Sequence, residues 1–445
     1  MPGPSHLSAS DRSSPLYLAT GAYLFACLVL GGASQANDGF DLALRLGGVP
    51  LLIWSCLRLT GKPLPAGAGL LLLFLGSLAL LPAVQLIPLP PGVWASLPGR
   101  TELARDLDMA GVVPSWRPLS LTPEATTDAL LGLIPFAAVL AAAISLPARD
   151  RVRLWIFTAA VAFLSVALGA LQIASGQSGG FRLYEDAGGS ATGFFANRNH
   201  WAAGLAATLP VLAHVLADRA GGQRLRPLTV AVLLAVFVAL MAGVAISGSR
   251  AGAVLLVLAV AGSVALLLTQ RRSQPRRSRG PLLLAGVAGV AGVVFAVVGA
   301  WAAASRFVDA PEDLRFDLWA DTLQQAQLHL PFGTGAGSFG PVFLGQESVD
   351  RLTAGFANQA HNDWVEILLE HGVLAALPIG LAVFAVLRGG RRAESAFILL
   401  SLGILLAASL VDYPLRTPAL QTLAALLIAC LAVRPQTTSR SGRAA

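Results

Sequence analysis

The chain has 445 residues, of which 55% are hydrophobic and 12% charged, and its formal net charge is +7. Together with a mean hydropathy of +0.69, this composition excludes a soluble globular domain and indicates a protein that crosses a membrane many times. The excess of basic residues does not indicate nucleic-acid binding, because these residues are spread over many short segments and are not gathered on a soluble domain.

Repeated apolar runs predict an all-α polytopic membrane protein with about twelve transmembrane helices, because about 20 apolar residues span the hydrocarbon core as a helix. The segment before the first run is only weakly basic, so we expect this run to stay as an uncleaved helix. Residues 1–445 are expected to form a single membrane domain. The runs lie near residues 15–33, 42–59, 64–87, 127–146, 152–175, 200–217, 227–247, 251–270, 281–303, 364–387, 395–411 and 417–433.

The placement of lysine and arginine predicts the orientation of these helices. About two thirds of the 31 basic residues fall in short segments that share one side of the membrane, and the positive-inside rule makes that side cytoplasmic. Both termini are therefore predicted to be cytoplasmic, with the basic segments in contact with anionic membrane lipids. Three longer segments, 88–126, 176–199 and 304–363, are predicted to lie on the outer side.

The largest outer segment, 304–363, is predicted to contain an amphipathic helix. Its acidic first turn and Pro311 suit a helix start, and its aspartates fall on a different side from its apolar residues. Two arrangements are open: the helix lies on the outer membrane surface, or it packs against other loops. The apolar positions at helical spacing are Leu314, Leu318, Trp319, Leu323 and Ala326.

Several polar side chains interrupt the apolar sequence at the predicted outer ends of helices. Arg198 lies in FFANRNHW and Arg250 in AISGSRAG, His361 lies in QAHNDW, and both Asp412 and Arg416 lie in LVDYPLRTP. A charge at a membrane boundary is costly unless it is paired, hydrated or used in function. Because all of these side chains are predicted to lie at the outer ends of helices, they favour a functional site on the outer face. Snorkelling and structural roles are the alternatives.

Arginine and histidine in this arrangement suggest chemistry on a phosphorylated lipid. Arginine stays charged and holds phosphate oxygens with two hydrogen bonds, so Arg198 and Arg250 can neutralise a diphosphate without a metal. A neutral His361 near a helix start can deprotonate a sugar hydroxyl, although capping or packing is an alternative role. No cysteine or histidine spacing typical of a metal site is present, so neither a metal nor a cofactor is predicted.

Four further residues are weaker candidates for substrate binding. Arg315 can contact phosphate or an anionic glycan, or it can pair with a nearby aspartate. Asn197, Asn199 and His200 can orient Arg198 or bind sugar hydroxyls, and their alternative role is to cap the helix that follows.

Acidic residues near the histidine provide two further candidates. Asp363, Glu366 and Glu370 lie on one face of a predicted helix, where paired carboxylates can perform acid–base chemistry or bind substrate. Their alternative role is to pair with outer arginines. Arg416, an arginine in the same region, is a further candidate for substrate binding.

Four motifs carry a resemblance to a known family: TGFFANRNHWAAGLAA, SGSRAGAVLL, RFDLWADTLQQAQLHLPFGTGAGSFG and AHNDWVEILLEHGVLAALP. In this order, over roughly residues 155–415, they resemble the O-antigen ligase and polymerase superfamily of bacterial membrane glycosyltransferases. The resemblance implies an all-helical glycosyltransferase fold of the C type. It also implies transfer of a glycan from undecaprenyl diphosphate to an acceptor hydroxyl at the periplasmic face of the inner membrane, by an inverting and metal-independent route.

The resemblance also implies residue roles. Arg198 and Arg250 would hold the diphosphate and stabilise its charge as the bond to the sugar breaks, and His361 would be the general base. A ligase that transfers the glycan to an acceptor glycolipid such as lipid A-core, or to protein, is the first hypothesis, and a polymerase that uses a second lipid-linked glycan is the alternative. A transporter or flippase is less favoured, because the charges lie at the outer boundary and no internal repeat is present.

Overall fold

The computed structural model of the protein describes most of the chain. Helices make up most of the described part, and its one small sheet pairs β1 with β2 in antiparallel register, Pro88 opposite Pro118. The described residues are 14–35, 38–61, 63–176, 181–184, 190–222, 227–273, 315–345, 357–389, 393–433 and scattered helical positions between 286 and 297.

The order of elements follows the predicted apolar runs, with shorter helices between them. The elements up to the middle of the chain are α1 (Pro15–Leu30), α2 (Asp38–Leu59), α3 (Ala68–Gln85), β1 (Pro88–Leu89), α4 (Pro91–Ala95), α5 (Thr101–Met109), β2 (Arg117–Pro118), α6 (Pro123–Leu131), α7 (Ile134–Ser145), α8 (Ala148–Ala174) and α9 (Arg198–Gly222). The remaining elements are α10 (Pro227–Ile246), α11 (Arg250–Ser273), α13 (Arg315–Leu328), α14 (Phe339–Leu344), α15 (Asp363–His371), η4 (Gly372–Ala375), α16 (Ala376–Gly389), α17 (Ala393–Ala408), η5 (Pro414–Arg416) and α18 (Pro418–Ala432).

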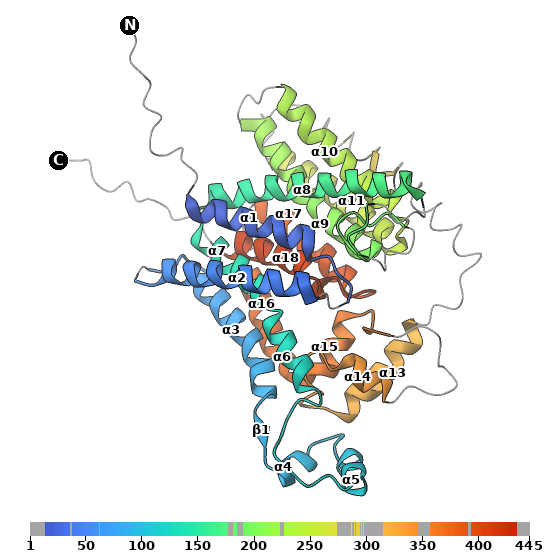
Figure 1. Cartoon of the computed structure of the whole chain (residues 1–445). Helices are drawn as coiled ribbons and strands as arrows, with labels where there is room; N and C mark the ends of the chain where they lie inside the picture. Colours follow the sequence, from blue (N-terminus) through green and yellow to red (C-terminus); the bar gives the residue numbers. More distant parts are fainter. Residues whose placement is uncertain are drawn as a thin grey trace, which may run out of the picture.

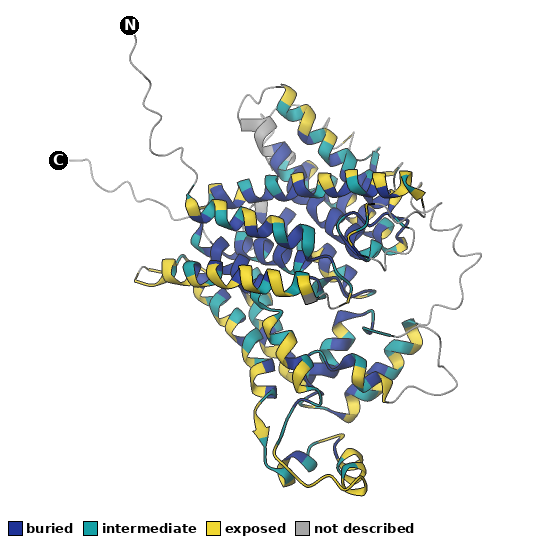
Figure 2. Ribbon diagram, viewed as in Figure 1, coloured by how far each residue is buried: buried dark blue, intermediate teal, exposed yellow. Residues whose placement is uncertain are grey.

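The fold is that of an all-α polytopic membrane protein, as predicted. Eight helical segments in the described residues are long and apolar enough to cross a membrane, and α1, α17 and α18 are shorter apolar helices. The predicted span 281–303 lies mostly outside the described residues, so the count of twelve stays a prediction. Large apolar side chains such as Leu73 and Val254 are exposed on the outer surfaces of these helices, as expected where lipid replaces water (Figure 2).

The core of the bundle forms around α9 and α18. In α9, 89% of the residues in the most apolar stretch between Arg198 and Ala217 are buried. Small residues such as Ala203 and Gly204 let neighbouring helices approach closely. Figure 1 shows α1, α8, α9 and α18 side by side in the upper part of the molecule. Because Ala419 donates its backbone N–H to the carbonyl of Gly31, α1 and α18 are antiparallel, and their other ends lie together at the opposite end of the bundle.

A second group of helices, α13, α14 and α15, gathers below the bundle in Figure 1. They share a small apolar core of their own, which includes Ala326, Phe339 and Leu369. Of the two arrangements open for the amphipathic helix, the structure therefore shows α13 packed against neighbouring elements, α14 and α15. The predicted helix start at Pro311 lies outside the described residues, within which α13 begins at Arg315.

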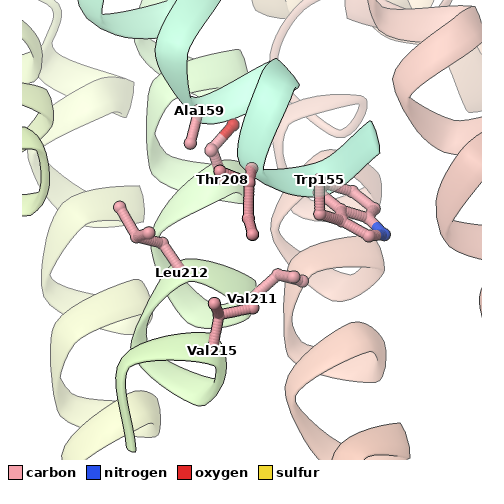
Figure 3. A pocket seen from close by; sticks show the side chains of 7 residues that line it. Trp155, Ala159, Thr208, Val211, Leu212 and Val215 are labelled. Atoms are coloured by element: carbon pink, nitrogen blue, oxygen red, sulfur yellow. The ribbon is translucent and has the colours of Figure 1, made fainter. Parts of the chain in front are cut away.

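A narrow crevice lies between α8 and α9, with Trp155 at one side and Leu212 at the other (Figure 3). Its empty space is about 190 Å³ including its open side, and its lining is apolar except for the hydroxyl of Thr208. No titratable side chain lines this crevice.

Two glycines fix the turn between α13 and α14. Gly333 has a φ of 79° and Gly335 a φ of 111°, which L-amino acids with a side chain rarely adopt. The protein itself fills the space beside them: a Cβ on Gly333 would lie 2.5 Å from the carbonyl oxygen of Glu370, and one on Gly335 would lie 2.3 Å from Oγ of Ser120. The stretch GTGAGSFG is therefore a packed turn.

We expect Gly333→Ala to destabilise the protein by at least about 1 kcal/mol, the cost of a left-handed backbone for a residue with a Cβ, with the clash against Glu370 in addition. Thermal unfolding in detergent, followed by tryptophan fluorescence, measures the change. Gly76→Ala in α3 is the control, because a Cβ there meets no atom within 4 Å. Equal melting temperatures for the two variants would contradict this account of the turn.

Candidate functional site

Three helices begin at the same end of the bundle, and each begins with a polar cap from the predicted motifs. Asn197 accepts the N–H of Asn199 at the start of α9 (2.7 Å), and Ser249 accepts the N–H of Gly252 at the start of α11 (2.9 Å). Asn362 accepts the N–H groups of Trp364 and Val365 at the start of α15. Such caps satisfy the free donors of a first turn, which fixes where each helix starts.

The buried carboxylate of Asp412 joins two of these helix starts to the turn between α17 and α18. Its Oδ2 accepts a hydrogen bond from the side-chain amide of Asn199 (2.7 Å). Its Oδ1 lies 3.2 Å from Nδ1 of His361 and 3.3 Å from Nε2 of His200, and it also accepts the N–H of Tyr413. A hydroxyl hydrogen bond from Ser249 to Asn199 (2.7 Å) adds the start of α11 to the same network.

The orientation of His361 is fixed by its contact with Asp412. Its Nδ1 faces Asp412, so in the neutral tautomer that donates this hydrogen to the carboxylate, Nε2 carries the free lone pair. Its side chain is 27% exposed, whereas that of Asp412 is 3% exposed. The backbone of His361 has a φ of 52°, an uncommon value for a residue other than glycine and one that clusters at functional sites.

Charge around this site keeps Asp412 ionised and Tyr413 protonated. Burial by itself would raise the pKa of Asp412, but His200 and His361 outweigh it and hold this pKa well below its usual range. Burial raises the pKa of Tyr413 to about 12. Its ring packs edge-on against both imidazoles, with centroids 4.7 Å from His200 and 5.0 Å from His361, so both rings are fixed in place.

The predicted arginines lie around this network. Arg198 is the first residue of α9, is half-buried, and donates to Oγ of Ser190 (3.2 Å). Arg250 is the first residue of α11, is exposed, and directly follows Ser249. Arg315, the first residue of α13, donates to the backbone carbonyl of Val411 (2.9 Å), next to Asp412. Positive side chains at helix starts add to the positive end of the helix dipole, which favours an anionic ligand.

Arg416 lies among three carboxylates of α15. Its guanidinium is 2.9 Å from Glu370 Oε2, 3.1 Å from Glu366 Oε1 and 3.7 Å from Asp363 Oδ1. Burial opposes its charge, but these carboxylates outweigh that effect and raise the pKa of Arg416 above its usual value. Asp363 is also bound by the hydroxyl of Ser409 (2.7 Å). The acidic residues thus pair with an outer arginine, which was the structural alternative drawn from the sequence.

The structure brings most of the sequence candidates into one region, although their roles stay predictions. Asn197 caps α9, and His200 is fully buried and contacts Asp412. Asp363 and Arg416 contact each other.

Sequence reasoning missed other members of the site. Asp412 was recognised as an unusual charge but was given no role, and Tyr413 was not considered. Ser249 carries the signal of a helix cap, a small polar residue just before an apolar run, which identifies it from the sequence. Arg182 was also missed, although it donates to the carbonyl of Ser190 (2.9 Å), the residue that Arg198 contacts through its hydroxyl.

Comparison with known protein families gives one match for this chain: residues 234–379 match the family described as O-antigen ligase. This region is about a third of the chain and contains Arg250, Arg315 and His361, whereas Arg198 and Asp412 lie outside it. No curated protein matches the chain. The match and the apolar helices together support a multi-pass bacterial membrane protein of polysaccharide biosynthesis, with O-antigen ligase-like or polymerase-like activity.

We expect Asp412→Asn to lower the melting temperature in a pH-dependent way. The folded-state pKa of Asp412 lies below its unfolded value of about 3.9, so its contribution to stability is fully present above that value and is lost as the pH falls through the folded value. The difference from the wild type should be largest between about pH 5 and 8 and should shrink below about pH 4. Asp108→Asn, at an exposed position of α5, is the control. A constant difference at every pH would exclude this linkage.

Arg416→Met should destabilise the protein by about 1–3 kcal/mol, less than a fully buried ion pair, because the Arg416 side chain is 25% exposed. Adding Glu366→Gln to Arg416→Met removes one of the uncompensated charges, so the double variant should be more stable than the single one. Arg153→Met, which breaks a partly exposed pair with Asp150, is the control and should cost less than about 1 kcal/mol. Chemical unfolding in detergent compares the variants.

Proposed function

We propose that this chain, whose residues 234–379 match the O-antigen ligase family, transfers a glycan from undecaprenyl diphosphate to an acceptor hydroxyl at the periplasmic face of the inner membrane. The observation that carries the proposal is the pairing of His361 with Asp412 at 3.2 Å, within a ring of helix starts that carry arginines. A base and a set of cations at one end of a membrane bundle match the two needs of this reaction.

The reaction requires a proton acceptor beside the acceptor hydroxyl. In the proposed step, Nε2 of His361 takes the hydroxyl proton while the oxygen forms a bond to the anomeric carbon of the donor sugar. The ionised Asp412 compensates the positive charge that develops on His361, as the aspartate does in a serine-protease triad. Attack from the face opposite the leaving group inverts the anomeric configuration.

The reaction also requires stabilisation of the leaving group. As the bond between the anomeric carbon and the phosphate oxygen breaks, the electron pair stays on undecaprenyl diphosphate, and guanidinium groups stabilise that charge. Arg198 and Arg250 begin α9 and α11, and the hydrogen bond between Asn199 and Ser249 ties these two helix starts together. We assign the diphosphate to these two arginines and an accessory contact with the donor to Arg315. The cations take the place of a metal, so the reaction should proceed in EDTA.

The acceptor decides between the two activities that the family allows. We propose ligation to lipid A-core as the first function, with polymerisation of lipid-linked glycans as the alternative outcome. The test is reconstitution of the purified protein in liposomes with an undecaprenyl-diphosphate glycan, EDTA, and either acceptor. A product on lipid A-core supports ligation, whereas a ladder of longer lipid-linked glycans supports polymerisation. Absence of transfer to any acceptor would exclude both.

We expect His361→Ala to lower the turnover number for transfer by about 10²–10⁴-fold, because it removes the base. Arg250→Lys should lose much of the activity, because an ammonium group holds phosphate less specifically than a guanidinium group. Arg105→Ala, in the exposed helix α5, is the control and should keep full activity. Full transfer by His361→Ala would disprove the base, and an intact Arg250→Lys enzyme would disprove only the two-point contact with the diphosphate.

A further inference from the structure

A second imidazole shares the oxygen that His361 contacts. His200 is fully buried, and its Nε2 lies 3.3 Å from Oδ1 of Asp412. Its other nitrogen, Nδ1, is buried and has no hydrogen-bond partner in the described part of the chain. The proposed transfer reaction uses His361 and Asp412 and leaves this buried titratable group unexplained.

The hydrogen-bond partners of His200 place a hydrogen on Nε2. Nε2–H donates to Oδ1 of Asp412, whereas Nδ1 faces no acceptor in the described part of the chain. Tyr413 packs edge-on against the ring, so the ring cannot turn to find another partner without disturbing that contact.

We propose that His200 is a positioning residue that acts on His361 through Asp412. Its Nε2–H holds the Asp412 carboxylate in place and in its ionised form, beside the amide of Asn199. The fixed carboxylate then accepts Nδ1–H of His361, which leaves Nε2 of His361 as the lone-pair nitrogen toward the acceptor. This inference rests on the proposed transfer reaction and assigns to His200 an indirect role in place of contact with sugar.

The proton balance keeps His200 unchanged during the reaction. The acceptor hydroxyl loses its proton to Nε2 of His361, which becomes an imidazolium, while Asp412 stays ionised between the two rings. The proton leaves His361 to water after the product forms, because this side chain is partly exposed. His200 neither takes up nor releases a proton in the cycle.

Other charged and titratable groups face this network from each neighbouring element. Asp363 of α15 lies close enough to interact electrostatically with His200, and it is compensated by Arg416. Tyr413 lies beside both rings, and Arg315 of α13 binds the carbonyl next to Asp412. None of these positions changes in the variants below, so a change in pH dependence reports on residue 200.

Two substitutions distinguish a positioning role of His200 from a role in packing alone. His200→Gln keeps a neutral N–H donor at about the position of Nε2, whereas His200→Leu keeps the volume and removes the donor. Glycan transfer is measured from pH 5 to 9, with kcat and the KM for the lipid-linked donor determined at each pH. Loss of a supporting hydrogen bond behind a functional group typically costs about 10–100-fold.

We expect His200→Leu to lower kcat by about 10–100-fold with little change in donor KM. Without the second imidazole, Asp412 loses one hydrogen bond and its charge acts more strongly on His361, so the acidic limb of the pH–rate profile should move upward by about half a unit or more. His200→Gln should restore most of kcat and the original profile. Equal kcat values for the Leu and Gln variants, or a profile that does not move, would overturn the proposal.

The transfer activity of His361→Ala distinguishes failure of this inference from failure of the proposed function. If His361→Ala is inactive while His200→Leu keeps wild-type kcat and profile, the role of His200 is wrong and the transfer mechanism stands. If His361→Ala stays active, the mechanism itself is wrong. If His200→Leu does not fold, ¹⁵N NMR of histidine in the wild type decides: a buried ring whose Nε2 carries a hydrogen from pH 5 to 8 supports the proposal, and a buried ring whose Nε2 carries the lone pair overturns it.

Discussion

The arrangement of the site depends on one buried carboxylate. Asp412 is 3% exposed, and a charge in such a place is stable only when hydrogen bonds and opposite charges surround it. Asn199, His200 and His361 supply these contacts from two separate parts of the chain. Because all three must reach the same two oxygens, the starts of α9 and α15 and the turn after α17 cannot shift independently.

A second set of contacts holds His361 from the other side. Trp319 of α13 donates its indole N–H to the carbonyl of Ala360 (2.9 Å), directly before the histidine. Arg416 binds the carboxylates of α15, which follow His361 in the sequence. The segment between the Trp319 contact and these ion pairs therefore has little freedom. This rigidity explains how His361 keeps a left-handed backbone, because the cost of such a conformation must be offset by its surroundings. Helix α13 and the ion pairs of α15 thus support the site.

Local sequence signals predicted many residues of this site but not the contacts between them. The caps Asn197 and Asn362 and the apolar runs behind them depend only on neighbouring residues, so helix starts were predictable. The contact between His361 and Asp412 joins residues 51 positions apart, and the contact with His200 spans 212 positions. A single sequence contains no signal for such distances, since many pairings of the helices would leave each apolar run equally buried in lipid or protein.

By itself, the sequence determined that this protein is an all-α membrane protein, roughly where most of its apolar helices lie, and that its unusual charges lie near helix ends. These properties follow from hydropathy and from the need of every backbone N–H in a membrane to find a partner. Only the tertiary structure decided which charges meet: Arg416 with the carboxylates of α15, and Asp412 with two histidines. The physical reason is that an apolar run fixes the length of a helix but not its neighbour, whereas a buried charge selects the one packing that satisfies it.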